Sequence, residues 1–120
     1  MRYSFPKSRR VVQSQTFTLI LRKGVCVADG TLVLFAVNQN RSIPSRIGIT
    51  IPKKTGNAVI RNRWKRLIRE SFRTQSESIP EGIEMIVRPK KGAKSSWKSI
   101  EKSVPYLAQK AAKRLQSTES

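Results

Sequence analysis

The chain has 120 residues, 38% of them hydrophobic, and its 25 Lys and Arg against 7 Asp and Glu give a formal net charge of +18. This length and apolar content fit one globular domain over residues 1–120, and they exclude both a second domain and a wholly disordered basic tail. A compact domain with so much like charge typically binds a polyanion, most often nucleic acid, and basic charge that serves only solubility is the alternative.

The single cysteine, Cys26, excludes an internal disulfide and a cysteine-based zinc site and favours the cytoplasm. The longest apolar run, residues 32–37, is too short to span a bilayer, so we expect no membrane partner. The N-terminus lacks the apolar stretch of a secretory signal. Its Arg and Ser residues, with no acidic residue before Asp29, leave an organellar transit peptide as an alternative.

The first elements predicted along the chain are a loose basic arm, a helix and a buried strand. The arm covers residues 1–8. The apolar spacing over residues 11–23 predicts a helix, which Gly24 ends. Residues 31–37 are β-branched and aromatic and apolar on both faces, which predicts the buried strand.

A second strand and a long helix follow a polar loop. Residues 46–51 alternate isoleucine with other residues, and Pro52 closes this strand because it cannot donate to a ladder. A basic turn then leads into a helix over residues 58–75, with Asn57 or Thr55 as its N-cap.

The last third of the chain predicts a strand over residues 83–88, a basic loop over 89–96 and a helix over 97–115. Pro105 falls inside that helix, so the helix is either kinked there or begins anew. We expect the tail, residues 116–120, to be frayed. Helices and strands in this order predict an α+β sheet with helices packed on it.

The predicted helix over residues 58–75 has two different faces when successive residues are placed about 100° apart. One arc is apolar and predicts the side that anchors the helix in the core: Ile60, Trp64, Leu67, Ile68 and Phe72. The adjoining arc offers a column of basic and amide side chains: Asn62, Lys65, Arg66, Arg69 and Arg73. Arg61 lies between the two arcs, and Arg63 and Glu70 lie on the far side.

The cationic arc favours RNA binding over simple solvation. A solvated helix usually mixes charge signs four residues apart, whereas positions 61, 65, 69 and 73 are all basic. Like charges on successive turns cost roughly a few tenths of a kcal/mol per pair, and phosphates between them would remove that penalty. Trp64 invites a base-stacking interpretation, but its place between Ile60 and Ile68 favours core packing.

The chain lacks the residues that protein nucleases use. It has no His, and Asp29 is its single Asp, while its six Glu residues are scattered. Protein nucleases cleave phosphodiesters with clustered carboxylates that hold metal ions or with His acid–base pairs. We therefore expect no catalytic residue and no metal site in this chain.

Residues 53–70, KKTGNAVIRNRWKRLIRE, closely resemble the signature of the bacterial-type ribonuclease P protein component, with its Arg-Asn-Arg motif. The resemblance extends to a basic N-terminus, a helix with Phe17 and a strand with Phe35, and it covers about residues 7–90. The helix near the C-terminus matches the family only in being a helix, and not in its residues.

This resemblance implies a two-layer α/β sandwich (ribosomal protein S5 domain 2-like), with a central mixed sheet of about four strands packed by helices. The implied order is α-β-β-β-α-β-α, whereas the residue patterns by themselves predict three of the strands. The resemblance also implies a left-handed crossover through the helix over residues 58–75, a handedness that spacing does not reveal.

Two RNA-binding regions are implied by the same resemblance. The catalytic RNA would contact the basic helix and the turn before it, through Lys53, Lys54, Arg61, Asn62, Arg63, Lys65, Arg66, Arg69 and Arg73. The 5′ leader of precursor tRNA would enter a cleft between the first helix and the sheet, lined by Phe17, Leu21 and Phe35. The basic N-terminal residues that fit the family are Lys7, Arg9 and Arg10. Without the resemblance, both phenylalanines would be assigned to an ordinary core.

Two positions depart from the family's pattern. Leu21 stands where many relatives have a second aromatic residue, so stacking in the cleft is expected to be weaker. Pro52 stands where many relatives have Ser before the paired lysines, which should stiffen the strand exit without removing charge.

In the resembled family the RNA subunit is the catalyst, and it uses Mg²⁺ held mainly by RNA to remove the 5′ leader from precursor tRNA. The resemblance therefore implies a subunit of an endoribonuclease whose partners are the catalytic RNA and precursor tRNA. The alternative is a general RNA chaperone or a ribosomal protein. A DNA-binding protein is disfavoured, because major-groove readers place short polar side chains at base edges.

Overall fold

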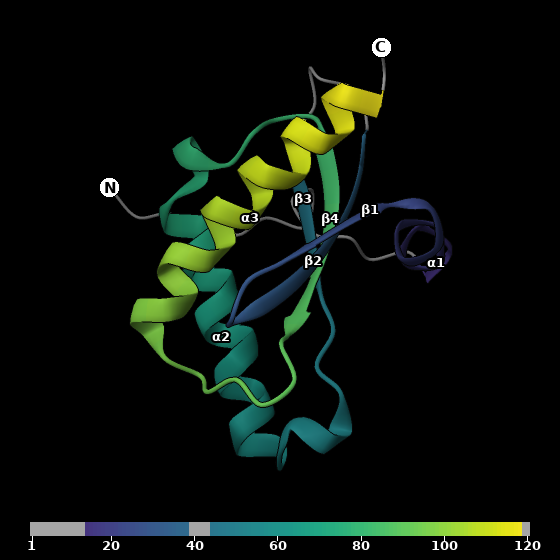
Figure 1. Ribbon diagram of the computed structural model, residues 1–120. Coiled ribbons are helices and arrows are strands. Elements are labelled where there is room, and N and C mark those ends of the chain that lie inside the picture. Colours follow the sequence, from purple (N-terminus) through teal and green to yellow (C-terminus); the bar gives the residue numbers. More distant parts are fainter. Residues whose placement is uncertain (1–13, 39–43, 119–120) are drawn as a thin grey trace.

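The computed structural model describes residues 14–38 and 44–118, which form a four-stranded sheet and three α-helices (Figure 1). The α-helices and strands, in chain order, are α1 (Ser14–Lys23), β1 (Val25–Ala28), β2 (Leu32–Asn38), β3 (Arg46–Ile49), α2 (Ala58–Thr74), β4 (Ile83–Pro89) and α3 (Trp97–Thr118). Two 3₁₀ turns flank α2, namely η2 (Lys53–Thr55) and η3 (Ser76–Ser78). The order α-β-β-β-α-β-α is the predicted one, and the fold class is confirmed.

The sheet is mixed, with the strand order β1-β2-β4-β3. β2 pairs antiparallel with β1 and with β4, whereas β3 pairs parallel with β4. Because β3 and β4 are parallel neighbours, the chain must cross over between them, and α2 lies in that connection. The left-handed sense of the crossover stays a prediction.

Alternating side chains give the sheet two apolar faces. The larger core lies under α2 and α3 and is built from the even positions of β2, the odd positions of β4 and the apolar stripes of both helices. On the opposite face Ile20 of α1 and Ile86 of β4 form a smaller cluster, against which Phe17, Phe35 and Val37 pack. Figure 1 shows α1 on one side of the sheet and the pair α2 and α3 on the other.

Polar side chains tie the elements together. Asp29 accepts hydrogen bonds from the backbone N–H groups of Thr31 and Leu32, at 2.8 and 2.9 Å, and a 2.6 Å hydrogen bond from Ser103 on α3. The single aspartate therefore shapes the β1–β2 turn and fixes α3 over it. Ser45 donates to the Pro80 carbonyl and accepts from the backbone N–H of Ile83 at 3.2 Å, which joins the chain before β3 to the chain before β4.

The structure differs from the sequence-based expectations at several places. The strand predicted over residues 46–51 ends at Ile49. The short strand β1 was not found from residue patterns, because four residues directly after a helix stop carry too little alternation. α3 continues through Pro105, so of the two predicted alternatives a new start there is wrong. It also runs to Thr118, so the predicted frayed tail is helical as far as that residue. The predicted basic arm over residues 1–8 lies outside the described residues.

Candidate nucleic-acid interface

The basic helix α2 begins at a well-formed cap. The side-chain oxygen of Asn57 accepts a 3.0 Å hydrogen bond from the backbone N–H of Ile60, which confirms Asn57 as the N-cap. η2, which carries the exposed Lys53 and Lys54, lies directly before this cap. The turn and the first helical residues therefore place their cations at one end of the molecule.

The apolar arc of α2 anchors the helix, with one exception. Trp64, Leu67, Ile68 and Phe72 are all buried, and Trp64 is only 1% exposed, so its assignment to the core is confirmed. Ile60 is 41% exposed, which corrects the prediction that it belongs to the anchoring arc. A helical projection gives a residue's direction but not its depth, and Ile60 lies in the first turn, beside Gly56 and beyond the main core.

The cationic arc faces away from the core. Asn62, Arg66 and Arg69 are exposed, while Arg61 and Lys65 are half-buried. The Nε atom of Arg61 is buried and has no hydrogen-bond partner within the described part of the chain. The arc thus offers exposed guanidinium groups at Arg66 and Arg69, on a helix whose opposite side is fixed by packing.

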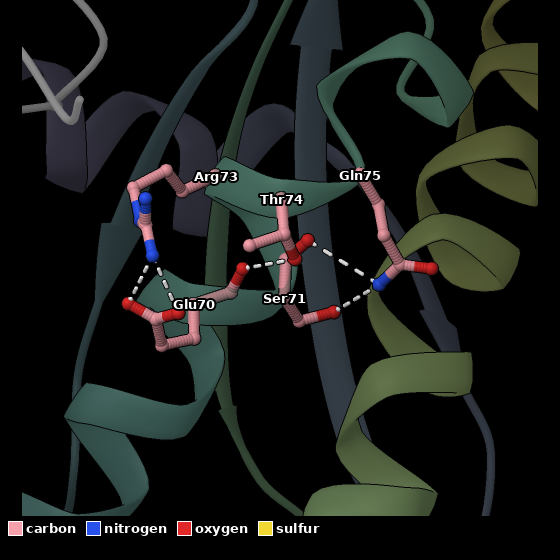
Figure 2. A network of polar contacts seen from close by, with 5 residues as sticks. All are labelled: Glu70, Ser71, Arg73, Thr74 and Gln75. Atoms are coloured by element: carbon pink, nitrogen blue, oxygen red, sulfur yellow. Dashed lines mark hydrogen bonds and ion pairs between the residues drawn. The ribbon is translucent and has the colours of Figure 1, made fainter. Parts of the chain in front are cut away.

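Two of the candidate arginines already have protein partners. Arg73 Nη2 lies 2.7 and 2.6 Å from the two carboxylate oxygens of Glu70 (Figure 2). Arg63 Nε donates to the carbonyl and hydroxyl oxygens of Ser95, at 3.3 and 3.2 Å, and so ties α2 to the loop before α3. Neither contact was predicted, since both depend on side-chain geometry that a pattern of charges does not contain.

The residues predicted to line a leader cleft lie where α1 packs against the open face of the sheet. Phe17 and Phe35 are both half-buried there, around Ile20 and Ile86, and Leu21 is 44% exposed. The guanidinium carbon of Arg88 lies 5.5 Å from the centre of the Phe35 ring. Both phenylalanines are thus partly accessible, and Phe35 lies beside a cation, a combination that favours binding of single-stranded nucleic acid.

A cavity of about 580 Å³ lies beside this face, between η2 and the loop that follows β4. Its apolar wall includes Val33, Pro52 and Pro89, and its cationic wall is made of Lys54, Arg88, Lys90 and Lys91. The basic loop over residues 89–96 is evident in the sequence, but its proximity to Lys54 is not. The fold brings these segments together because β4 is paired with β2 and with β3. The predicted N-terminal contacts Lys7, Arg9 and Arg10 lie outside the described residues.

Two acidic residues of the described segments have partners within the fold. Asp29 is occupied at the β1–β2 turn, and Glu70 is paired with Arg73. Residues 14–38 and 44–118 contain no group of three or more His, Cys, Asp or Glu that could hold a metal ion. In the same segments, no helix is both long and apolar enough to cross a membrane.

Comparison with known protein families assigns the chain to a family. A family model described as Ribonuclease P matches residues 5–112. The chain belongs to the ribonuclease P protein family. Its function is therefore that of the family, 5′ processing of tRNA as a protein subunit of ribonuclease P, and the alternative of a general RNA chaperone or ribosomal protein is not favoured.

Relatives and solved structures agree with this assignment. The chain is 36% identical to the ribonuclease P protein component of Clostridium novyi, over 88% of this chain and 95% of that one. It is 32% identical to the component of Brevibacillus brevis, over 88% and 84% of the two chains. The Staphylococcus aureus ribonuclease P protein structure matches with a TM-score of 0.74 at 34% identity, over 88% and 96%. The Thermotoga maritima protein matches with 0.76 at 27% identity, over 84% and 96%.

Proposed function

We propose that this ribonuclease P protein binds the catalytic RNA through the cationic arc of α2 and the 5′ leader of precursor tRNA through the cleft beside α1. The observation that carries the first part is the separation of α2 into a buried apolar side and an exposed side with Arg66 and Arg69. Guanidinium groups on a rigid helix can contact phosphates without a cost for ordering the backbone.

The second part of the proposal rests on the opposite face of the sheet. Phe17 and Phe35 remain partly exposed there although they are large apolar side chains, and Arg88 lies over the Phe35 ring. A base stacked on such a ring typically contributes about 1–3 kcal/mol. Because the two regions lie on different sides of the sheet, one domain can hold two RNA segments at once.

The phosphodiester cleavage is assigned to the RNA subunit. The described acidic residues are engaged in the fold or lie apart from one another, which supports a chain that positions RNA and does not hydrolyse it. We further propose that Mg²⁺ is held mainly by RNA in the complete enzyme, and that this chain's cations reduce the repulsion between the two RNAs. A cytoplasmic location stays a prediction.

Reconstitution tests the proposal. Cleavage of precursor tRNA is measured with the ribonuclease P RNA at low Mg²⁺, with no protein, with this protein and with the double variant Arg66→Gln/Arg69→Gln. We expect strong stimulation by the protein and a marked loss of it in the variant. If the unaltered protein gives no stimulation, the chain does not assist the RNA enzyme, and a general RNA-binding role would have to replace this proposal.

A further inference from the structure

The outward side of α3 carries a second basic surface, made of Lys98, Lys102, Tyr106 and Lys110 and called here the α3 stripe. All four side chains are exposed, and Tyr106 is 54% exposed. They follow one another at four-residue spacing, so each step advances about 6 Å along the helix axis. Glu101 stands three residues after Lys98, but no ion pair joins these two described residues.

The α3 stripe is separate from the cationic arc of α2. α2 and α3 lie side by side on the same face of the sheet (Figure 1). Besides apolar packing, the contact between them includes hydrogen bonds from Ser71 and Gln75 to the carbonyl of Glu101, at 3.2 and 2.7 Å. Near the start of α3, Arg63 on α2 donates a hydrogen bond to the carbonyl of Ser95. The stripe residues are exposed, whereas Ser71 at this boundary is buried, so the stripe lies outside both the boundary and the core that α3 covers.

α3 is held firmly along its length. Ser103 donates to Asp29 at 2.6 Å, Gln109 donates to the Ser78 carbonyl at 2.9 Å, and Arg114 donates to the Cys26 carbonyl at 2.8 Å. The lysines of the stripe are therefore presented by a fixed helix, so a partner that binds them does not have to order the backbone.

Tyr106 distinguishes this stripe from an ordinary solvated helix face. Its ring lies 5.9 Å from the Lys110 ammonium group, and its exposure means that it contributes little to the core. A phenolic hydroxyl between lysines can donate to a phosphate or to a ribose 2′-hydroxyl. A solvated stripe would instead gain from acidic residues four positions away, and none is present between Lys102 and Lys110.

We propose that the α3 stripe binds the phosphate backbone of a second segment of the catalytic RNA, apart from the segment on α2. This inference rests on the proposed function, in which α2 binds that RNA. We assign the bound segment to the catalytic RNA because α3 lies on the same face of the sheet as α2. The residues predicted to bind the leader lie on the opposite face. Lysines are point charges without the planar fork of arginine, so they suit backbone contacts that do not depend on base sequence.

Salt-dependent binding measures the contribution of the stripe. The triple variant Lys98→Gln/Lys102→Gln/Lys110→Gln keeps good helix formers and removes three charges. Its affinity for the ribonuclease P RNA should fall about tenfold or more at moderate salt, and the slope of log affinity against log salt should become shallower by about 2. The charge-keeping triple change to Arg should restore both. An unchanged slope in the Gln variant would overturn the proposal.

Directed cleavage locates the RNA segment. In a Cys26→Ser background, an iron–EDTA probe is attached to Lys102→Cys on α3 or to Arg66→Cys on α2, in the complex with ribonuclease P RNA and precursor tRNA. We expect the two probes to cut different segments of the catalytic RNA. If the α2 probe cuts it and the α3 probe cuts nothing or only precursor tRNA, this inference fails while the proposed function stands. If neither probe cuts the catalytic RNA, the proposed function itself fails.

Discussion

The Nε2 atom of Gln75 lies 2.7 Å from the carbonyl oxygen of Glu101, the oxygen that Pro105 leaves without a helical hydrogen bond. A proline has no N–H, so the carbonyl four residues before it lacks its usual partner. Gln75 supplies one donor, and the Ser71 hydroxyl supplies a second at 3.2 Å. Gln75 also donates to Ser71 Oγ at 2.9 Å, as Figure 2 shows. The end of α2 thus supplies hydrogen-bond donors to the carbonyl that Pro105 leaves without a helical partner, and α3 can continue past the proline.

This compensation predicts that Gln75 and Pro105 are energetically coupled. Gln75→Ala should lower the free energy of unfolding by about 1 kcal/mol, because the Glu101 carbonyl loses its closest donor. In a Pro105→Ala background the new N–H can donate to that carbonyl, so the same change should cost clearly less. Urea unfolding of the four proteins in a double-mutant cycle measures the difference. Equal costs in both backgrounds would show that Gln75 stabilises the fold in some other way.

The two neighbouring arginines Arg69 and Arg73 should contribute unequally to RNA binding. Arg69 is exposed, whereas the Arg73 guanidinium is held by both carboxylate oxygens of Glu70. We expect Arg69→Gln to make the slope of log affinity against log salt shallower by about 0.7–0.9, the value for one phosphate contact, and Arg73→Gln to change it less. The two variants remove the same charge from the same helix, so each serves as the control for the other. A larger effect of Arg73→Gln would mean that RNA displaces Glu70.

Removal of the Phe35 ring should weaken binding of the leader and leave binding of the tRNA body unchanged. Phe35→Leu keeps an apolar side chain against Ile86 but removes the ring beside Arg88. If a leader base stacks there, the affinity for precursor tRNA should fall by roughly 5- to 150-fold, which corresponds to about 1–3 kcal/mol. The affinity for leaderless tRNA should not change. Val37→Ala, in the same cluster, is the control for loss of packing, and equal losses for both RNAs would indicate damage to the core.

The cap of α2 allows stability and binding to be separated. Asn57→Ala should cost about 1 kcal/mol of stability, since the N–H of Ile60 loses the partner that Asn57 provides at 3.0 Å. Asn57→Asp should keep the cap but place a negative charge beside Lys54, so thermal stability should persist while RNA affinity falls. Thermal unfolding and RNA titration of both variants check this. An aspartate variant that binds as well as the unaltered protein would place RNA away from this end of α2.

Local patterns were enough to predict much of this molecule. The alternation that begins at residue 46, the spacing along α3 and a cap at Asn57 or Thr55 each depend on neighbouring residues, and each was predicted from the sequence. The structure ends the strand at Ile49 and selects Asn57 as the cap. The direction of the cationic arc followed from helical geometry alone. The assignment of Phe17 and Phe35 to a cleft needed the family resemblance, because a half-buried aromatic has the same sequence pattern as a core residue.

The features that were missed depend on residues far apart in the chain. Arg63 lies on the predicted far side of α2, and only the fold shows that Ser95 lies beside it. The cavity between η2 and the loop after β4 likewise needs the strand order of the sheet. The continuation of α3 through Pro105 depends on Gln75, whose position is set by the end of a different helix.

Gly24 allows α1 to approach the sheet closely, and its replacement should disturb the leader cleft. A Cβ atom there would lie 2.5 Å from the carbonyl oxygen of Ile20 and 2.7 Å from that of Ala36, and both are backbone atoms that cannot move aside cheaply. Gly24→Ala should therefore lower stability by about 1–3 kcal/mol, as overpacking does, and shift α1 away from β2. Gly30→Ala is the matched control, since a Cβ at that position meets nothing within 4 Å. Thermal unfolding should separate the two variants, and only Gly24→Ala should reduce the preference for precursor tRNA over leaderless tRNA. A clash at Gly24 would force either the helix or the strand to move. If the two variants behave alike, no such movement occurs, and the position of α1 does not depend on this contact.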